Sequence, residues 1–334
     1  MDPTPDPAPR PARFELLRAW WRGAPGVALR WAFAVLPFLW LGQRVSWRTL
    51  GARVLEVGLA PLAHCAFWIL AAFAVAALRW GRLLRAYARP GAERPPFLTL
   101  YRHVLVAQYY ALLPSGMVGD VVRGARVASC LPSLATSYLV LLLDRLAALL
   151  GLALLASAAA LALPPVGSLG GLLRVALPAI AAPVLALFVL PTFLRRNGLE
   201  ARAAALPWVG RHLQRLPAAE GYGTLVEATA CSVGAQLCAI ASVAALLGPI
   251  AQRGPWATVT DALRVVPAII LATFIPLTPA ALGQRELFFV TFYGMVGVGA
   301  PEALAGSLLH FGTLVLVSLL GLPVLLWERH NTTP

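Results

Sequence analysis

Long, uninterrupted apolar runs constrain this chain more than any other feature. They cover Val54–Leu78, Leu134–Leu163 and Leu172–Leu194, and each is close to or above the roughly 20 residues that cross a bilayer core as a helix. In lipid, only helices and closed barrels satisfy their own backbone hydrogen bonds. A barrel would show short segments of alternating polarity. The runs therefore predict an all-α polytopic integral membrane protein.

Composition and charge support this class and exclude others. The 334 residues are 59% hydrophobic and 12% charged, whereas a soluble domain is about 25% charged. The net charge is +13, and the sequence contains arginine but no lysine. These arginines cluster at the ends of apolar runs, where membrane topology and anionic headgroups explain them, so we expect no nucleic-acid partner. The cysteines and histidines lack metal-ligand spacing, and we expect free thiols, no metal and no cofactor.

The order of runs and charges predicts the domain organisation. We expect a cytoplasmic Pro/Arg-rich tail over residues 1–25, a transmembrane domain over 26–328 and a C-terminal tail over 329–334. Arginine-rich loops at residues 79–94 and 195–215 mark the cytoplasmic side, which places both termini there and makes the protein multi-pass in the cytoplasmic or cell inner membrane. The link with Arg44, Arg48 and Arg53 resists this topology, because it would face outward.

Two segments interrupt the apolar pattern. They read "LLPSGMVGDVVRGAR" at 112–126 and "FIPLTPAALGQRELFF" at 274–289. Before the first, Phe97–Leu113 fits either an interfacial amphipathic helix or the first arm of a hairpin that dips into the bilayer. We therefore expect about six to eight transmembrane helices plus two broken re-entrant hairpins. Halves 26–163 and 172–328 would start on opposite sides, as in inverted-topology transporters, with the breaks meeting near the midplane.

A charged pair lies inside the long run 134–163. Asp144 and Arg145 are about 11 residues in, roughly 17 Å deep at 1.5 Å per residue. A charge there costs about 2.5–3.5 kcal/mol. Neighbouring helical residues point about 100° apart, so each of the two needs a partner from another segment. The candidates in the two interruptions are Asp120, Arg123, Arg285 and Glu286.

Two interpretations of these charges stay open, and both can hold together. One is a structural ion-pair network that clamps the halves. The other is an anion site, because helix N-termini and guanidinium groups bind phosphate. The predicted substrate-binding set, with no catalytic residue, is Gln108, Tyr109, Gly119, Asp120, Arg123, Asp144, Arg145, Gly283, Arg285 and Glu286. His310, inside the last run, fits a hydrogen-bonded packing residue better than a proton-linked group.

The interruptions also resemble a known family. Pro114, Gly119, Asp120 and Arg123, then Asp144-Arg145, then "GQRE" at 283–286 followed by "PEA" at 301–303 are similar, in order and spacing, to the signatures of the lysylphosphatidylglycerol synthetase transmembrane-region family. The similarity extends over about residues 97–326. Val118 departs from it, since the family usually has glycine there.

The resemblance implies a flippase-like membrane domain that moves lipids between leaflets. Fused members carry a cytosolic aminoacyl-transferase domain, and we expect none here, so this chain is expected to be a stand-alone transporter and not an enzyme. The expected partners are membrane lipids with an anionic, polyprenyl-phosphate or aminoacyl headgroup, and a homodimer stays open. Two alternatives remain: a scaffold or regulatory subunit of a lipid or glycan pathway, and an intramembrane transferase with His103 or His310 as base.

Overall fold

The structure, a computed structural model, describes residues 46–112, 118–164, 222–273 and 281–332, together with Thr278 and scattered positions within 35–43 and 170–198. The part of the chain described is helical. In its first half the helices are α3 (Trp47–Glu56), α4 (Leu59–Tyr87), α5 (Phe97–Ala111), α6 (Val118–Arg126), the 3-10 turn η1 (Ala128–Cys130) and α7 (Leu134–Ala162). In its second half they are α11 (Tyr222–Ile250), α12 (Pro255–Thr273), α13 (Gln284–Gly294), α14 (Ala300–Leu319) and α15 (Gly321–Thr332).

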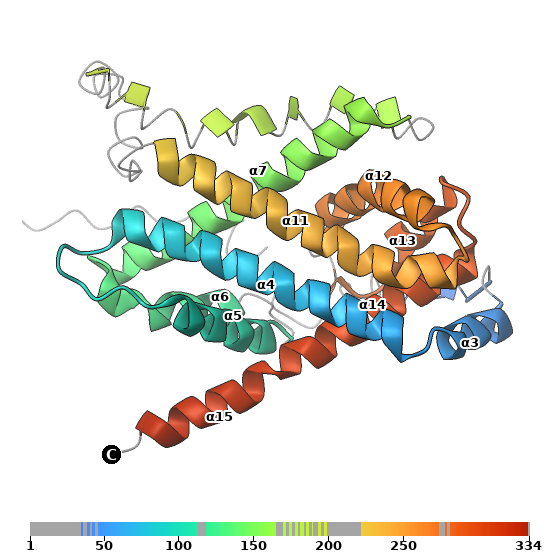
Figure 1. Cartoon of the computed structure of the whole chain (residues 1–334), viewed down its shortest axis with the longest axis horizontal. Coiled ribbons are helices and arrows are strands. Elements are labelled where there is room, and N and C mark those ends of the chain that lie inside the picture. The colour runs from blue at the N-terminus through green and yellow to red at the C-terminus, as the bar shows by residue number, and fades with distance from the viewer. Residues whose placement is uncertain are drawn as a thin grey trace, which may run out of the picture.

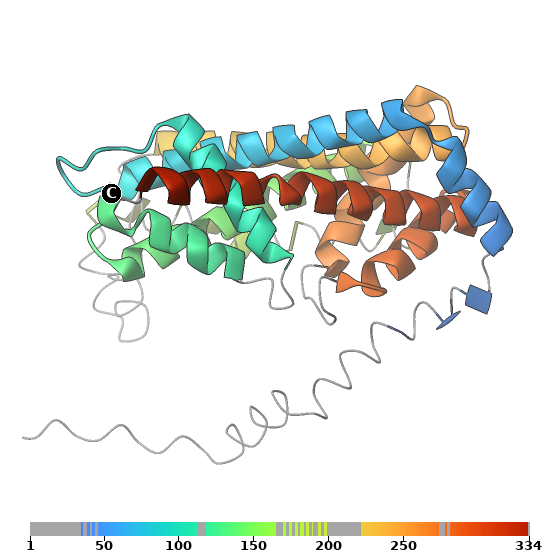
Figure 2. The same ribbon diagram turned by 90° about the horizontal axis from the view of Figure 1, so that it is seen from below.

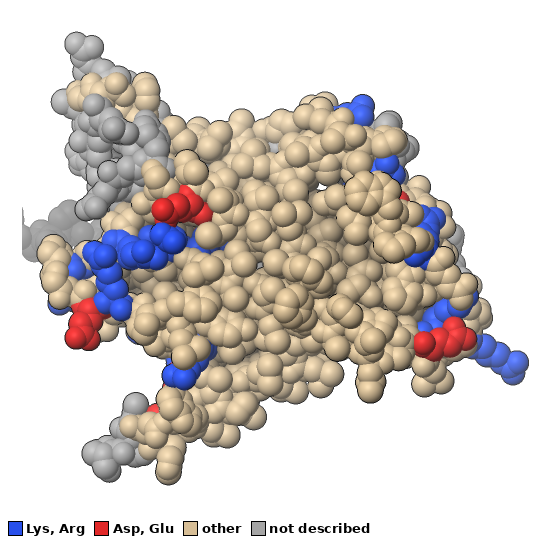
Figure 3. All heavy atoms as spheres, in the orientation of Figure 1, with Lys and Arg blue, Asp and Glu red and all other residues tan. Residues whose placement is uncertain are grey.

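Five described segments are long and apolar enough to cross a membrane, which confirms the predicted class. They are Leu59–Tyr87, Leu134–Ala162, Gly223–Ile250, Pro255–Thr273 and Ala300–Asn331. The expected span at Leu172–Leu194 falls mostly outside the described residues. Figure 3 shows the corresponding surface: charged side chains gather toward the two ends, and the broad belt between them is uncharged.

Helices α4 and α11 lie side by side and antiparallel along the long axis (Figure 1). Arg82 near the end of α4 forms an ion pair of 2.9 Å with Glu227 near the start of α11. Helix α7 crosses beneath α11, where Gly151 allows a close approach because a Cβ there would overlap Ser232. Small residues at such crossings are typical of helix packing in membranes.

Helices α5 and α6 are the two described arms of a hairpin at the first interruption, and that this hairpin dips into the bilayer stays a prediction. Helices α5 and α6 pack together, and a Cβ on Gly119 would overlap the carbonyl oxygen of Ala107. The open end of the hairpin rests on α15, since Arg102 near the start of α5 lies 4.6 Å from the Trp327 ring. Arg126 at the end of α6 forms an ion pair of 2.6 Å with Glu328, which follows Trp327 on α15.

The second interruption is also a hairpin. Gln284, the first residue of α13, donates to the carbonyl of Ala272 near the end of α12 at 2.8 Å. At the open end, Arg253 just before α12 donates to the carbonyl of Val296 just after α13 at 2.8 Å. Because α5 follows the end of α4 and α12 follows the end of the antiparallel α11, the two hairpins start from opposite ends of the bundle (Figure 2).

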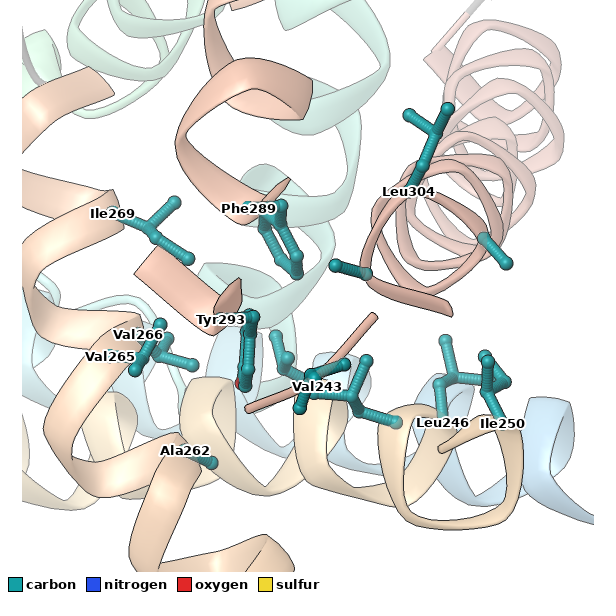
Figure 4. Packing of buried hydrophobic residues seen from close by; sticks show 14 of the residues in the cluster. Val243, Leu246, Ile250, Ala262, Val265, Val266, Ile269, Phe289, Tyr293 and Leu304 are labelled. Atoms are coloured by element: carbon teal, nitrogen blue, oxygen red, sulfur yellow. The ribbon is translucent and has the colours of Figure 1, made fainter. Parts of the chain in front are cut away.

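Two apolar clusters hold this arrangement. The larger one joins α11, α12, α13 and α14 with parts of α3 and α4, and it contains Tyr293 and Phe289 of α13 together with Val243, Val266 and Leu304 (Figure 4). The smaller one joins α4, α5 and α7 around residues such as Trp80 and Leu150. The hairpins carry the charged residues of the interruptions, so the packing of these clusters fixes the positions of those residues.

Candidate functional site

The carboxylate of Asp144 is the centre of a buried charge cluster. It is the eleventh residue of α7, about 15 Å from the start of that helix at 1.5 Å per residue. One oxygen accepts from Arg79 Nε and the other from Arg123 Nη2, each at 2.7 Å. Asp144 is 2% exposed, and both arginines are buried. The predicted bond between Asp144 and an interruption residue is confirmed by Arg123, which lies on α6.

Arg79 was missed as a member of this cluster. The arginine-rich stretch from residue 79 was expected to be a loop, but α4 continues through it to Tyr87. The helix extends because Trp80, Leu83 and Leu84 keep an apolar face against α5 and α7, and because Asp144 neutralises Arg79. The signal was present in the sequence: apolar residues recur at 80, 83, 84 and 87, the spacing of a buried helix face.

The cluster has one positive charge more than it has negative. Two guanidinium groups share one carboxylate, and Ser232 adds only a neutral acceptor, 3.3 Å from Arg79 Nη1. Arg123 lies 4.8 Å from the Trp80 ring, and its Nε is buried with no partner among the described residues. Buried charge without a counter-ion is costly, so this cluster favours the presence of an anion nearby.

Asp120 and Arg145 form a second, more accessible ion pair. Arg145 donates to Asp120 Oδ2 from Nε at 2.9 Å and also from Nη2. The Arg145 side chain is 54% exposed and that of Asp120 is 28% exposed. Asp120 and Arg123 share the α7-facing side of α6, and each binds a different member of the Asp144-Arg145 pair. An exposed guanidinium has further N–H groups, and these can donate to a second oxygen ligand.

Arg285 and Glu286 were expected among the partners of the α7 pair, but they bind each other. Glu286 is fully buried, its Oε2 accepts from the Gly283 backbone amide at 2.7 Å, and Ser307 donates to its Oε1 at 3.3 Å. Arg285 also lies 4.2 Å from the Phe311 ring. Neighbours pair here because both belong to the first turn of α13, where Glu286 reaches back to cap the helix start.

The remaining predicted residues have structural roles or lie apart. Gly119 provides the α5–α6 contact, and Gly283 adopts φ 76°, which disfavours other side chains. Tyr109 packs near Gly321 and against Tyr110. The structure does not bring Gln108 or Tyr109 to the ion pairs within the described residues. Pro114 and Pro276, at the interruptions themselves, lie outside those residues.

His310 is a hydrogen-bonded packing residue, as predicted. Its Nε2 lies 3.0 Å from Ser242 Oγ. The Ser242 hydroxyl also lies 2.7 Å from the carbonyl of Ala239 and can donate to it. His310 on α14 and Ser242 on α11 therefore join these two helices through a side-chain hydrogen bond.

Together, the helices and the membrane-depth ion pairs define a multi-pass α-helical membrane protein with two opposed hairpins. The family model for the lysylphosphatidylglycerol synthase TM region matches residues 27–321. The chain belongs to this family. No curated protein and no solved structure matches it.

Proposed function

We propose that this protein is a lipid translocase that binds a phosphate-bearing headgroup beside Arg145. The observation that carries the proposal is the contrast between the two ion pairs of α7. Asp144 is enclosed by two arginines, whereas Arg145 is more than half exposed at nearly the same depth. The enclosed cluster supplies an uncompensated positive charge, and Arg145 supplies accessible N–H donors for phosphate oxygens.

In this proposal Arg123 has an indirect role. It is buried, binds Asp144 and lies over Trp80, so it holds α6 against α7 and contributes positive potential. Asp120 holds the Arg145 guanidinium when no headgroup is present and competes with a phosphate for it. Such competition makes binding weak enough for release, which a transporter needs.

The arrangement of the halves supports movement between leaflets. A long helix followed by a hairpin and another long helix occurs twice, once as α4 to α7 and once as α11 to α14, and the hairpins begin at opposite ends. We interpret this as an inverted-topology repeat, in which rocking of one half against the other exposes a central site alternately. The two breaks were expected to meet near the midplane. Their residues, 113–117 and 274–277, lie outside the described part of the chain, so this stays a prediction.

The proposed orientation places the α4–α5 end on the cytoplasmic side of the membrane. Arginines are denser there than at the α3 end, and basic residues are retained on the cytoplasmic side. At the α4–α5 end they are Arg82, Arg85, Arg89, Arg94 and Arg126. At the α3 end, Arg53 pairs with Glu56 and Glu302, and Arg253 pairs with Asp261. Arg53 is one of the three arginines that resisted this topology, and its two carboxylate partners offset its charge.

The test is leaflet exchange in liposomes by Arg145→Ala and Arg145→Lys. We expect the alanine variant to lose exchange of a fluorescent phosphatidylglycerol with an unchanged melting temperature, and lysine to restore it partly, because lysine keeps the charge but not the two-pronged contact. Arg48→Ala, an exposed arginine at the opposite end of the bundle, is the matched control. Wild-type exchange by Arg145→Ala would remove this residue from the mechanism.

A further inference from the structure

A cavity lies where α4 ends and α5 begins. It has a volume of about 310 Å³, and its floor contains Ala77, Leu84 and Leu100, all buried. Two exposed arginines, Arg85 and Arg94, line the same cavity. We refer to it as the α4–α5 pocket. Its size is at the lower limit of ligand pockets, about 300–1,000 Å³, so it can hold part of an amphiphile, with an apolar slot beneath a cationic rim.

The two rim arginines have no carboxylate partner among the residues described. Arg85 uses Nε for a long 3.4 Å bond to the carbonyl of Gly81 in its own helix, and its terminal nitrogens have no partner there. Arg94 forms no hydrogen bond or ion pair with any described residue. Glu93 lines a neighbouring, more polar hollow of about 490 Å³ but not the α4–α5 pocket. Figure 3 shows basic side chains gathered over this end of the molecule.

The wall of the pocket is held in place by the protein itself. The backbone amide of Arg89 donates to the carbonyl of Cys130 at 3.0 Å, and Arg89 Nη2 donates to the carbonyl of Leu131 at 3.1 Å. These bonds fix the segment after α4 against η1, so Cys130 forms part of the lining. The cavity therefore exists before a ligand binds, which lowers the ordering cost of binding.

We propose that the α4–α5 pocket binds an anionic phospholipid from the adjacent leaflet, with acyl-chain carbons in the apolar slot and the phosphate between Arg85 and Arg94. The complementarity is between an apolar floor with two arginines that have no carboxylate partner in the described part of the chain and a molecule with an apolar chain and one anion. This site is separate from the one beside Arg145: Arg85 is six residues beyond Arg79 on α4, about 9 Å farther along the helix. It does not depend on the translocase proposal.

Cys130 allows a direct test. The full-length protein is placed in nanodiscs of phosphatidylcholine with or without phosphatidylglycerol, treated with a maleimide, and the labelled peptides are quantified. Cys231 and Cys238, half-buried on α11, are internal references. We expect phosphatidylglycerol to slow labelling of Cys130 alone. Each arginine near a membrane surface contributes about fivefold in affinity, so Arg85→Ala/Arg94→Ala should weaken protection about 25-fold, and Arg48→Ala should not.

The other outcomes contradict the proposal. Equal protection in pure phosphatidylcholine would show that the net negative charge of the headgroup adds nothing. Equal protection by soluble glycerophosphoglycerol would show an anion site without a chain slot. Protection that survives in the double variant would place the lipid elsewhere, and an absence of protection would leave the pocket without a lipid. Leaflet exchange measured on the same samples reports on Arg145 separately, so failure of one proposal does not obscure the other.

Discussion

Asp144→Asn should be far more destabilising than Asp120→Asn, although both carboxylates form ion pairs between α6 and α7. The Asp144 carboxylate is enclosed and binds both Arg79 and Arg123 at 2.7 Å. Removing its charge leaves two buried guanidinium groups without a counter-ion, and breaking such a buried pair costs about 3–5 kcal/mol. Asp120 and Arg145 are partly exposed, and ion pairs of that kind contribute about 0–1 kcal/mol.

The assay is reversible unfolding in mixed micelles, with increasing SDS and tryptophan fluorescence as the signal. Trp80 is fully buried and stacks on Arg123, so part of this signal reports on the cluster itself. The two variants should differ by at least about 2 kcal/mol, or about 30-fold in the unfolding equilibrium. In the double variant Asp144→Asn/Arg79→Gln, loss of one positive charge should recover about 1 kcal/mol or more. Equal losses in the two single variants would refute the reasoning.

Other predictions concern the hairpins. Glu286→Gln removes a fully buried carboxylate that binds Arg285 and the Gly283 amide, so we expect a loss of about 3 kcal/mol in the same titration; a change below about 1 kcal/mol would contradict its buried role. Gly119→Ala should cost about 1–3 kcal/mol, because its Cβ would overlap Ala107 backbone. Gly51→Ala, in open space on α3, is the control and should be neutral or slightly stabilising.

Uniform apolar runs could be predicted closely from the sequence. The long run 134–163 corresponds to α7 almost residue for residue, since Ser133 caps its start by accepting from the Thr136 amide and no proline interrupts it. The hairpins were also predictable, because Pro and Gly beside charged residues do not continue a membrane helix. The ion pairing of α7 with α6 followed from the cost of an unpaired charge.

Residues whose roles depend on tertiary contacts were harder to predict. Arg79 was assigned to a loop, because an arginine at the end of an apolar run usually marks the membrane boundary; only its contact with Asp144, 65 residues away, places it inside. The pairing of Arg285 with its neighbour Glu286 depends on the backbone turn at Gly283. Which arginines are enclosed and which are accessible depends on helix packing, so no local pattern separates Arg123 from Arg145.

The most direct test of the central claim is a map of where a headgroup binds. A phosphatidylglycerol analogue with a photoreactive headgroup is cross-linked to the wild-type protein and to Arg145→Ala in liposomes, and the modified peptides are identified. The account predicts cross-links to α6 and α7 around Asp120 and Arg145 that disappear in Arg145→Ala, while any cross-links at the α4–α5 pocket persist. Cross-links absent from α6 and α7, or unchanged by Arg145→Ala, would contradict it.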